Sequence, residues 1–360
     1  MFRREQTGWI GIDIGTATVK VAQLARRENQ LRVITQSIVP RSASSLAIDT
    51  EQETGGLWSA SGDLGAAVSL SHALQGKRAA VSMPMGYCDI HHVDNLVIGS
   101  DDYETIVRQA VESATQSSAE HLTFDIWPAE IPDNSTEPVR WNVLAAAEAW
   151  SNQLYSDVVE NKFICQRIDG LPQSLARAVN LGHPNPLDCS IAALDWGFSQ
   201  ATFCIVKDGR PVYARVLKDC GLQRIVTSLA SGLGIHCENV FGLLEKHGLR
   251  GLLSHENDEI DEVVADLITD AAEQLERELS RTLSYLDISR KSIKPEMLYL
   301  FGGGGLMQGV AEFLTRQLNI DTRVWTLNSP HEAPAHDSSF GNDCLFAQAL
   351  ALSALAWENS

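Results

Sequence analysis

The N-terminal part of the chain alternates hydrophobic and polar residues with a period of two. Isoleucines occupy every second position from Ile10 to Ile14, with small or polar residues between them, and β-branched residues resume at Val19 and Val21. This period is typical of strands that lie in a sheet. The pattern therefore predicts a β-hairpin with a tight turn over 15–18.

The predicted turn has the composition of a phosphate cradle. It combines small residues, hydroxyl groups and a nearby lysine: Gly15, Thr16, Ala17, Thr18 and Lys20. Small residues leave backbone N–H groups approachable, and a lysine adds positive charge for phosphate oxygens. Asp13, just before the turn, is placed to hold a metal ion through water. Taken alone, the stretch also fits an ordinary hairpin with a surface aspartate and lysine.

A second copy of the hairpin favours the phosphate interpretation. The stretch 190–206 repeats strand, Asp-x-Gly turn and strand, with Asp195 and Gly197 in the places of Asp13 and Gly15. An internal duplication on this scale predicts two similar α/β halves. Two facing phosphate hairpins then predict a nucleotide clamped between the halves.

In two further regions, the spacing of hydrophobic residues predicts regular secondary structure. Between the hairpins, 85–150 is expected to form a small separate unit, with strands at 88–97, 122–127 and 140–147 and a helix through Ala114. Beyond the second hairpin, apolar residues at i, i+3 and i+4 spacing predict a long amphipathic helix over 258–286. Its apolar stripe is expected to face the core.

A third stretch with chemical meaning follows a predicted strand at 297–301. Four successive glycines, 302–305, precede a helix that begins near Val310. Each glycine loses backbone entropy on folding, so close approach of a ligand to the main chain is the favoured explanation. The alternative explanation is a long, flexible connection between the strand and the helix, without a ligand.

Composition narrows the class of protein. With 360 residues, 44% of them hydrophobic, the chain can bury the cores of two or more domains. A formal net charge of −18 argues against a general nucleic-acid or anionic-membrane surface. Seven cysteines without C-x-x-C spacing predict neither a disulfide framework nor zinc, which favours the cytosol. No apolar stretch predicts a membrane span, and the helix over 347–357 is expected to pack against the body.

In this order and at this spacing, the two Asp-x-Gly hairpins and the late glycine run resemble the superfamily of actin, heat-shock chaperones and sugar kinases. Within it the chain is most similar to the PilM family of type IV pilus assembly proteins, relatives of FtsA. The stretches with this resemblance are 11–20, 77–127, 208–215 and 303–309. The resemblance implies an α/β, actin-like (ribonuclease H-like) duplicated fold, with two domains around a nucleotide cleft and an inserted subdomain of the FtsA and PilM type.

The same resemblance implies domain boundaries. They are 1–84 and 151–186 for subdomain 1A, 85–150 for the inserted subdomain 1C, 187–232 and 293–360 for subdomain 2A, and 233–292 for the helical subdomain 2B.

The resemblance also implies the ligands and their residues. ATP phosphates would contact Gly15, Thr16, Ala17, Thr18, Lys20, Gly197 and Phe198. Asp13 and Asp195 would hold Mg²⁺ through water. Adenosine would lie against Gly302, Gly303, Gly304, Gly305 and Glu245.

Departures from the family pattern bear on catalysis. Trp196 and Phe198 stand where the family usually has smaller residues, so a bulky ring is expected beside the second phosphate turn. The position where actin carries a water-orienting glutamine falls near Asp169 and Gly170, and neither of these is a glutamine. Orientation of the attacking water accounts for much of the catalysis in such hydrolases. At most a slow ATPase is expected. Asp169 is the candidate general base for the kinase alternative.

The implied function is a cytosolic ATP-binding adaptor at the inner face of the cytoplasmic membrane. It would reach the membrane through a PilN-like single-span partner, whose tail binds a groove between the first subdomain and the inserted one. A filament-forming ATPase of the FtsA or MreB type and a small-molecule kinase are the alternatives. Pilus and type II secretion platforms are not separated by the sequence, and self-association is left open.

Overall fold

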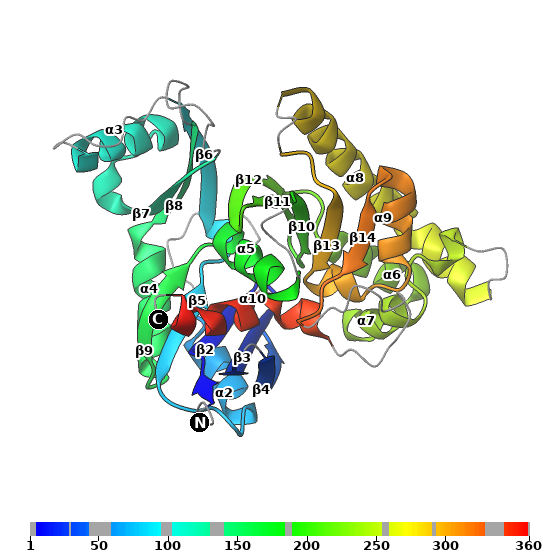
Figure 1. Ribbon diagram of the computed structural model, residues 1–360. Coiled ribbons are helices and arrows are strands. Elements are labelled where there is room, and N and C mark those ends of the chain that lie inside the picture. The colour runs from blue at the N-terminus through cyan, green and yellow to red at the C-terminus, as the bar shows by residue number, and fades with distance from the viewer. Residues whose placement is uncertain are drawn as a thin grey trace. The chain divides into compact units, whose positions relative to one another are not determined.

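The computed structural model (Figure 1) describes residues 5–28, 30–42, 59–94, 103–129, 140–183, 189–253, 259–289, 293–327 and 342–358. The chain falls into two compact units. Unit 1 comprises Met1–Ser174, Pro211–Tyr213 and Gln348–Ser360, and unit 2 comprises Leu175–Arg210 and Ala214–Ala347.

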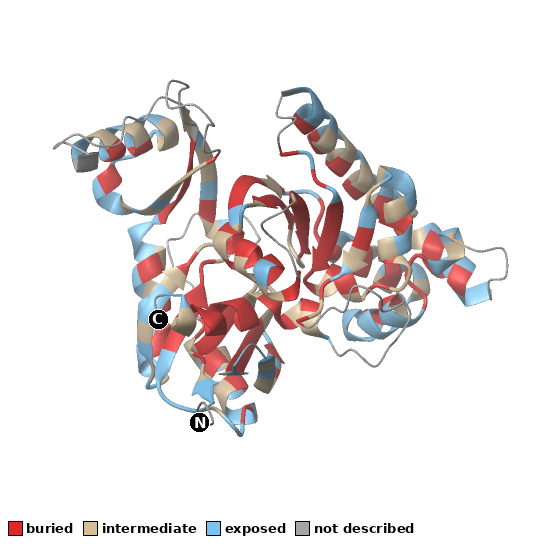
Figure 2. Ribbon diagram, in the orientation of Figure 1, coloured by how far each residue is buried: buried red, intermediate tan, exposed pale blue. Residues whose placement is uncertain are grey.

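Unit 1 is organised around a six-stranded sheet. Its strands are β1 (Gln6–Thr7), β2 (Ile10–Ile14), β3 (Thr18–Arg27), β4 (Gln30–Pro40), β5 (Arg78–Ser82) and β9 (Ile164–Asp169). β3 pairs antiparallel with β2 and with β4, whereas β5 lies parallel to β2 and β9 parallel to β5. All five residues of β2 are buried, as expected for a central strand (Figure 2).

Three helices cover this sheet. α2 (Ser61–Leu70) packs on β3 and β4, and α4 (Glu148–Glu160) packs on β9. The end of α10 (Asp343–Ala354) lies on β2, where a Cβ on Gly11 would come within 1.8 Å of the Ala349 carbonyl oxygen. Only glycine therefore fits at position 11.

The C-terminal helix is fixed to the first sheet by buried hydrogen bonds. The Ser353 hydroxyl donates to the Trp9 carbonyl at 2.6 Å and accepts from the Leu24 N–H at 2.9 Å. The expected packing of this helix against the body is confirmed. From Gln348 onwards it belongs to unit 1, so the expected placement of all of 293–360 in the second half does not hold for this end.

The inserted part of unit 1 is a small sheet with one helix on it. β6 (Cys88–Asp94), β8 (Arg140–Ala147) and β7 (Leu122–Pro128) pair antiparallel in that order. α3 (Tyr103–Thr115) contributes Val107 and Val111 to a core shared with Trp141 and Val143. The three predicted strands and the helix are present. Residues 95–97, at the end of the first predicted strand, lie outside the described residues.

Unit 2 repeats the strand topology of unit 1. β10 (Ile191–Trp196), β11 (Ala201–Lys207), β12 (Arg210–Leu217), β13 (Met297–Phe301) and β14 (Asp321–Val324) lie in the order β12-β11-β10-β13-β14. β10 pairs antiparallel with β11 and parallel with β13, which pairs parallel with β14. The order β4-β3-β2-β5-β9 in unit 1 is the same pattern. The predicted duplication is thus present at the level of topology.

Of the helices in the described ranges, five lie wholly or mostly in unit 2. They are α5 (Leu171–Gly182), whose first turn belongs to unit 1, α6 (Leu222–Leu233), α7 (Cys237–Lys246), α8 (Glu259–Ser289) and α9 (Val310–Leu318). The stripe of α8 is buried at Val264, Ile268 and Leu275, but Ile260 and Val263 in its first turns are about half exposed, against expectation. No helix in the described ranges is long and apolar enough to cross a membrane.

Candidate functional site

The first predicted turn closes as a tight hairpin. The Gly15 N–H donates to the Thr18 carbonyl at 2.9 Å, which bends the chain at 15–18. No described residue accepts a hydrogen bond from the backbone N–H of Thr16 or Ala17, and both residues are half-buried. Successive N–H groups without an internal acceptor form a site for an anion.

A buried ion pair lies beside this turn. Asp13 and Lys20 are directly opposite each other on β2 and β3, with Lys20 Nζ 2.8 Å from Asp13 Oδ2. Their side chains are only 5% and 10% exposed. The other carboxylate oxygen of Asp13 accepts a hydrogen bond from the Ser82 hydroxyl at 3.1 Å. Removing one partner from such a pair leaves an uncompensated buried charge, which costs about 3–5 kcal/mol.

Three polar residues lie at one edge of the sheet. Asp13 is near the end of β2, and Ser82 and Asp169 are the last residues of β5 and β9. Because these strands are parallel, their carboxyl ends meet at the same edge, where ligands of open α/β sheets bind. The Asp169 carboxylate accepts from the Ser174 hydroxyl at 3.2 Å and lies 3.6 Å from Arg167 Nε. Asp169 is 2% exposed and both its oxygens are engaged, which fits a structural role better than that of a general base.

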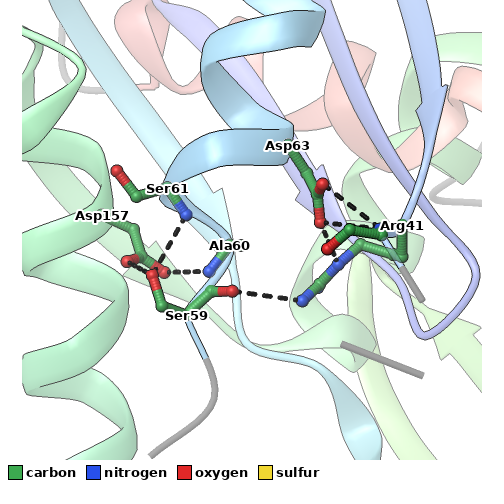
Figure 3. Close-up of polar contacts among 7 residues, drawn as sticks. Arg41, Ser59, Ala60, Ser61, Asp63 and Asp157 are labelled. Carbon is green, nitrogen blue, oxygen red and sulfur yellow. Dashed lines mark hydrogen bonds and ion pairs between the residues drawn. The ribbon is translucent and has the colours of Figure 1, made fainter. Parts of the chain in front are cut away.

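A buried arginine, Arg41, supports the first turn. The Arg41 N–H donates to the Ala17 carbonyl at 2.8 Å, and Arg41 Nε donates to Asp63 Oδ2 at 2.8 Å (Figure 3). Burial lowers the pKa of Arg41, and the nearby Asp63 carboxylate opposes this shift. The ion pair thus ties the turn to the first turn of α2.

A second carboxylate holds the start of the same helix. Asp157, on α4, accepts from the Ser59 hydroxyl and from the Ala60 N–H, each at 2.8 Å (Figure 3). A carboxylate at a helix N-terminus also interacts favourably with the helix dipole. The hairpin turn, α2 and α4 are therefore joined by two charged side chains, Arg41 and Asp157.

The second predicted turn has the same geometry in unit 2. The Gly197 N–H donates to the Gln200 carbonyl at 3.1 Å, and among the described residues nothing accepts from the N–H of Phe198 or Ser199. Asp195 is buried, as Asp13 is, but the residue opposite it is Thr202. The lysine is therefore specific to the first copy.

The glycine run packs against its own chain. Gly302 has φ +74°, and a Cβ there would lie 2.6 Å from Asp195 Oδ1. A Cβ on Gly304 would lie 2.5 Å from the side chain of Trp196, whose indole Nε1 donates to the Cys220 carbonyl at 2.8 Å. The ring of Trp196 thus explains Gly304, and the positive φ and the approach to Asp195 explain Gly302, so two of the four glycines are explained without a ligand.

The remaining predicted residue, Glu245, is exposed near the end of α7. Its neighbour Leu244 accepts a hydrogen bond from the Gln308 N–H at 3.0 Å, and the Gln308 carbonyl accepts from the Leu249 N–H at 2.8 Å. The end of α7 is therefore fixed to the loop that follows the glycine run. This brings together the two segments that were predicted to contact adenosine.

Sequence reasoning missed three residues of these sites. Ser82 bonds Asp13, Ser199 adds a second N–H to its turn, and Arg41 supports the first turn. Ser82 follows the small and apolar residues 79–81 and precedes Pro84, so the end of a strand near it was a usable signal. The role of Arg41 depends on contacts distant in sequence and had no local signal.

Comparison by sequence finds no matching family model and no matching curated protein. Comparison by structure finds a chain of the PilM–PilN type IV pilus biogenesis complex, with 17% identity and a TM-score of 0.77 over 98% of this chain and 99% of that one. MreB5 of Spiroplasma citri bound to AMPPNP matches at 12% identity and a TM-score of 0.52, over 96% of this chain and 94% of that one.

A third match is ethanolamine utilization protein EutJ from Carboxydothermus hydrogenoformans, with 14% identity and a TM-score of 0.52 over 97% of this chain and 89% of that one. At these identities the likeness establishes the fold. The chain has the duplicated, actin-like α/β fold that its sequence predicts, and it shares that fold with PilM along nearly its whole length.

We predict that Gly304→Ala destabilises unit 2 by about 1–3 kcal/mol, because its Cβ would overlap the Trp196 side chain. Gly303→Ala is the matched control, since its Cβ would meet only the tip of Leu222 at 3.1 Å. Urea unfolding of the two variants and the wild type measures the difference. Equal stability of both variants would show that the Trp196 contact does not require glycine at 304.

Proposed function

We propose that this chain is an ATP-binding adaptor of a type IV pilus-like assembly platform, and that it holds the cytoplasmic tail of a PilN-like inner-membrane protein. The observation that favours this most is the end-to-end match to a chain of the PilM–PilN complex, which covers 98% of this chain and 99% of that one. The inserted sheet β6-β8-β7 lies within the matched length. The proposal places the protein at the inner face of the cytoplasmic membrane through its partner.

The residues of unit 1 fit the phosphates of ATP. The N–H groups of Thr16 and Ala17 have no acceptor among the described residues, and Lys20 supplies a positive charge next to them. Asp13 is proposed to hold a magnesium ion through water, because Mg²⁺ keeps several of its waters and is bound through one or two carboxylates together with phosphate oxygens. Bound Mg²⁺ would neutralise phosphate charge. Lys20 would then share its contact between Asp13 and a phosphate oxygen.

The residues of unit 2 provide a matching but different set. The N–H groups of Phe198 and Ser199 are proposed to contact phosphate, and Asp195 to bind Mg²⁺ through water. The segment 302–305 and Glu245 are proposed to contact adenosine. Among these glycines, Gly303 has the fewest neighbouring atoms around the position of an added Cβ.

The proposed nucleotide acts mainly as a structural ligand. Asp169 is buried with both carboxylate oxygens engaged, and no other candidate base was found in the sequence. Turnover is therefore expected to be slow. The same observation weighs against the kinase alternative, which needs a free general base. A ligand that binds one conformation better shifts the population towards it, so ATP would favour the form that binds the partner.

The partner tail is proposed to dock where the inserted sheet joins the larger one. Tyr87 immediately precedes β6, and Trp150 lies in the first turn of α4, just after β8. Their rings are 4.1 Å apart and both side chains are half-buried. Partly exposed aromatic side chains are the usual anchors of a protein interface.

For the nucleotide, we predict Mg²⁺-dependent ATP binding by the wild type that falls at least about tenfold in Asp13→Asn/Lys20→Met. The double variant removes both charges of the buried pair together, which avoids the folding cost of leaving one charge alone. Lys218→Ala, an exposed lysine of unit 2, is the control. Isothermal titration calorimetry measures all three proteins.

Unchanged affinity in a folded double variant would contradict the assignment of Asp13 and Lys20. Phosphate release measured on the same samples tests the second part of the proposal. Rapid release by the wild type would make the protein an active ATPase.

For the partner, we predict that Trp150→Ala weakens binding of a synthetic PilN-like cytoplasmic tail by about tenfold or more, because it removes one ring of the aromatic pair. Tyr155→Ala is the control, since Tyr155 lies on the same helix and its side chain is 53% exposed. Fluorescence anisotropy of the labelled tail gives both affinities. Equal loss in both variants, or no loss in either, would place the tail elsewhere.

A further inference from the structure

A pocket of about 680 Å³ lies in unit 1 at the opposite edge of the sheet from Asp13. Its lining includes Arg78 and Ile164, the first residues of β5 and β9, whereas Ser82 and Asp169 are the last residues of the same strands. Five extended residues separate the two edges by about 13 Å. The volume falls within the range of about 300–1,000 Å³ that ligand sites occupy.

The charge of this pocket differs from that of the chain. The sequence has 46 acidic and 28 basic residues, yet the pocket lining contains Lys77 and Arg78 and no aspartate or glutamate. Both basic side chains are exposed, and within the described ranges neither forms an ion pair or a side-chain hydrogen bond. Two uncompensated positive charges at one pocket attract an anionic group.

Part of the pocket lining is apolar. Trp9 and Trp357 line it together with Ile164, whose side chain is 53% exposed. Arg26 lies over the Trp357 ring at 5.0 Å and donates to Gln6 Oε1 at 3.0 Å, so it holds two lining residues in place. An anion that enters this pocket therefore meets aromatic surface beside the two cations.

A buried glutamine makes the pocket a preformed feature. Gln23 is fully buried, and its Nε2 donates to the carbonyls of Gly8 at 2.9 Å and Gln75 at 2.8 Å. Its Oε1 accepts from the Gln75 N–H at 2.8 Å. Gly8 and Gln75 both line the pocket, so one side chain joins its two sides. A fully satisfied buried amide of this kind makes the surrounding backbone rigid.

One wall of the pocket is a strand edge. β1 pairs with β3 and, in the described part of the sheet, with no other strand, and the residues of β1 line the pocket. A free strand edge offers backbone groups to an extended peptide. A small anion would use the two charges, whereas an extended peptide would use the charges, the aromatic walls and the strand edge together.

We propose that this pocket binds an acidic segment of a partner protein in extended conformation. A carboxylate of the segment lies between Lys77 and Arg78, and a neighbouring apolar side chain packs against Trp9 and Trp357. This contact is separate from the proposed nucleotide residues and from the proposed tail site at Tyr87 and Trp150. It gives the adaptor a second binding surface.

Selection from a random peptide display library against the whole protein tests the proposal. Enriched peptides are expected to contain aspartate or glutamate next to an aromatic or aliphatic residue. Their affinity, measured by fluorescence anisotropy, should fall about tenfold or more in Lys77→Glu/Arg78→Glu and weaken as salt rises. Arg210→Glu/Lys218→Glu changes two exposed cations of unit 2 by the same charge and should bind normally. ATP binding should be unchanged in both double variants.

Three outcomes would overturn the proposal. If the enriched peptides lack acidic residues, Lys77 and Arg78 do not select the ligand. Equal affinity of the peptides for the wild type and for Lys77→Glu/Arg78→Glu would lead to the same conclusion. Saturable quenching of tryptophan fluorescence by citrate, with no peptide enriched, would make the pocket a small-anion site. A negative result in the ATP or tail experiments would not decide the pocket proposal, because the residues changed in those experiments lie outside the pocket.

Discussion

The buried ion pair between Asp13 and Lys20 is the interaction on which the first half-site depends. The two residues oppose each other across the first hairpin, so the strand register places their side chains next to each other. Burying both charges is costly, and a close contact together with the Ser82 hydroxyl offsets that cost. The sheet, the tight turn and the N–H groups of Thr16 and Ala17 thus lie around one charged pair near the C-terminal end of β2.

The two copies of the fold have diverged in how they use the same hairpin. Unit 1 places a lysine opposite its aspartate and supports its turn with the buried Arg41. Unit 2 has Thr202 at the lysine position and instead packs Trp196 against Gly304. One copy therefore contributes charge and the other contributes close packing. This difference is consistent with the proposal, in which unit 1 alone supplies a cation to the phosphates and the glycine run of unit 2 contacts adenosine.

The sequence was sufficient for the hairpins and the long helix, because each depends on local periodicity. It was also sufficient for the duplicated fold, because the second Asp-x-Gly hairpin repeats the first and the three motifs resemble a known superfamily. Contacts distant in sequence were not predictable. Ser82 reaches Asp13 only through the parallel pairing of β5 with β2, and Ser353 draws the end of α10 onto the first sheet. The glycine run was interpreted through a ligand, although Trp196 explains Gly304. The pocket at Lys77 also required the sheet, since its lining comes from segments far apart in the chain.

Hydrogen exchange followed by mass spectrometry, with and without Mg²⁺ and ATP, would decide whether the two hairpins bind nucleotide. It measures the backbone amides proposed to contact phosphate, Thr16 and Ala17 in one turn and Phe198 and Ser199 in the other. We expect slower exchange in the peptides that contain these turns when Mg²⁺ and ATP are present. Unchanged exchange in both turns at saturating ATP would contradict nucleotide binding by these hairpins.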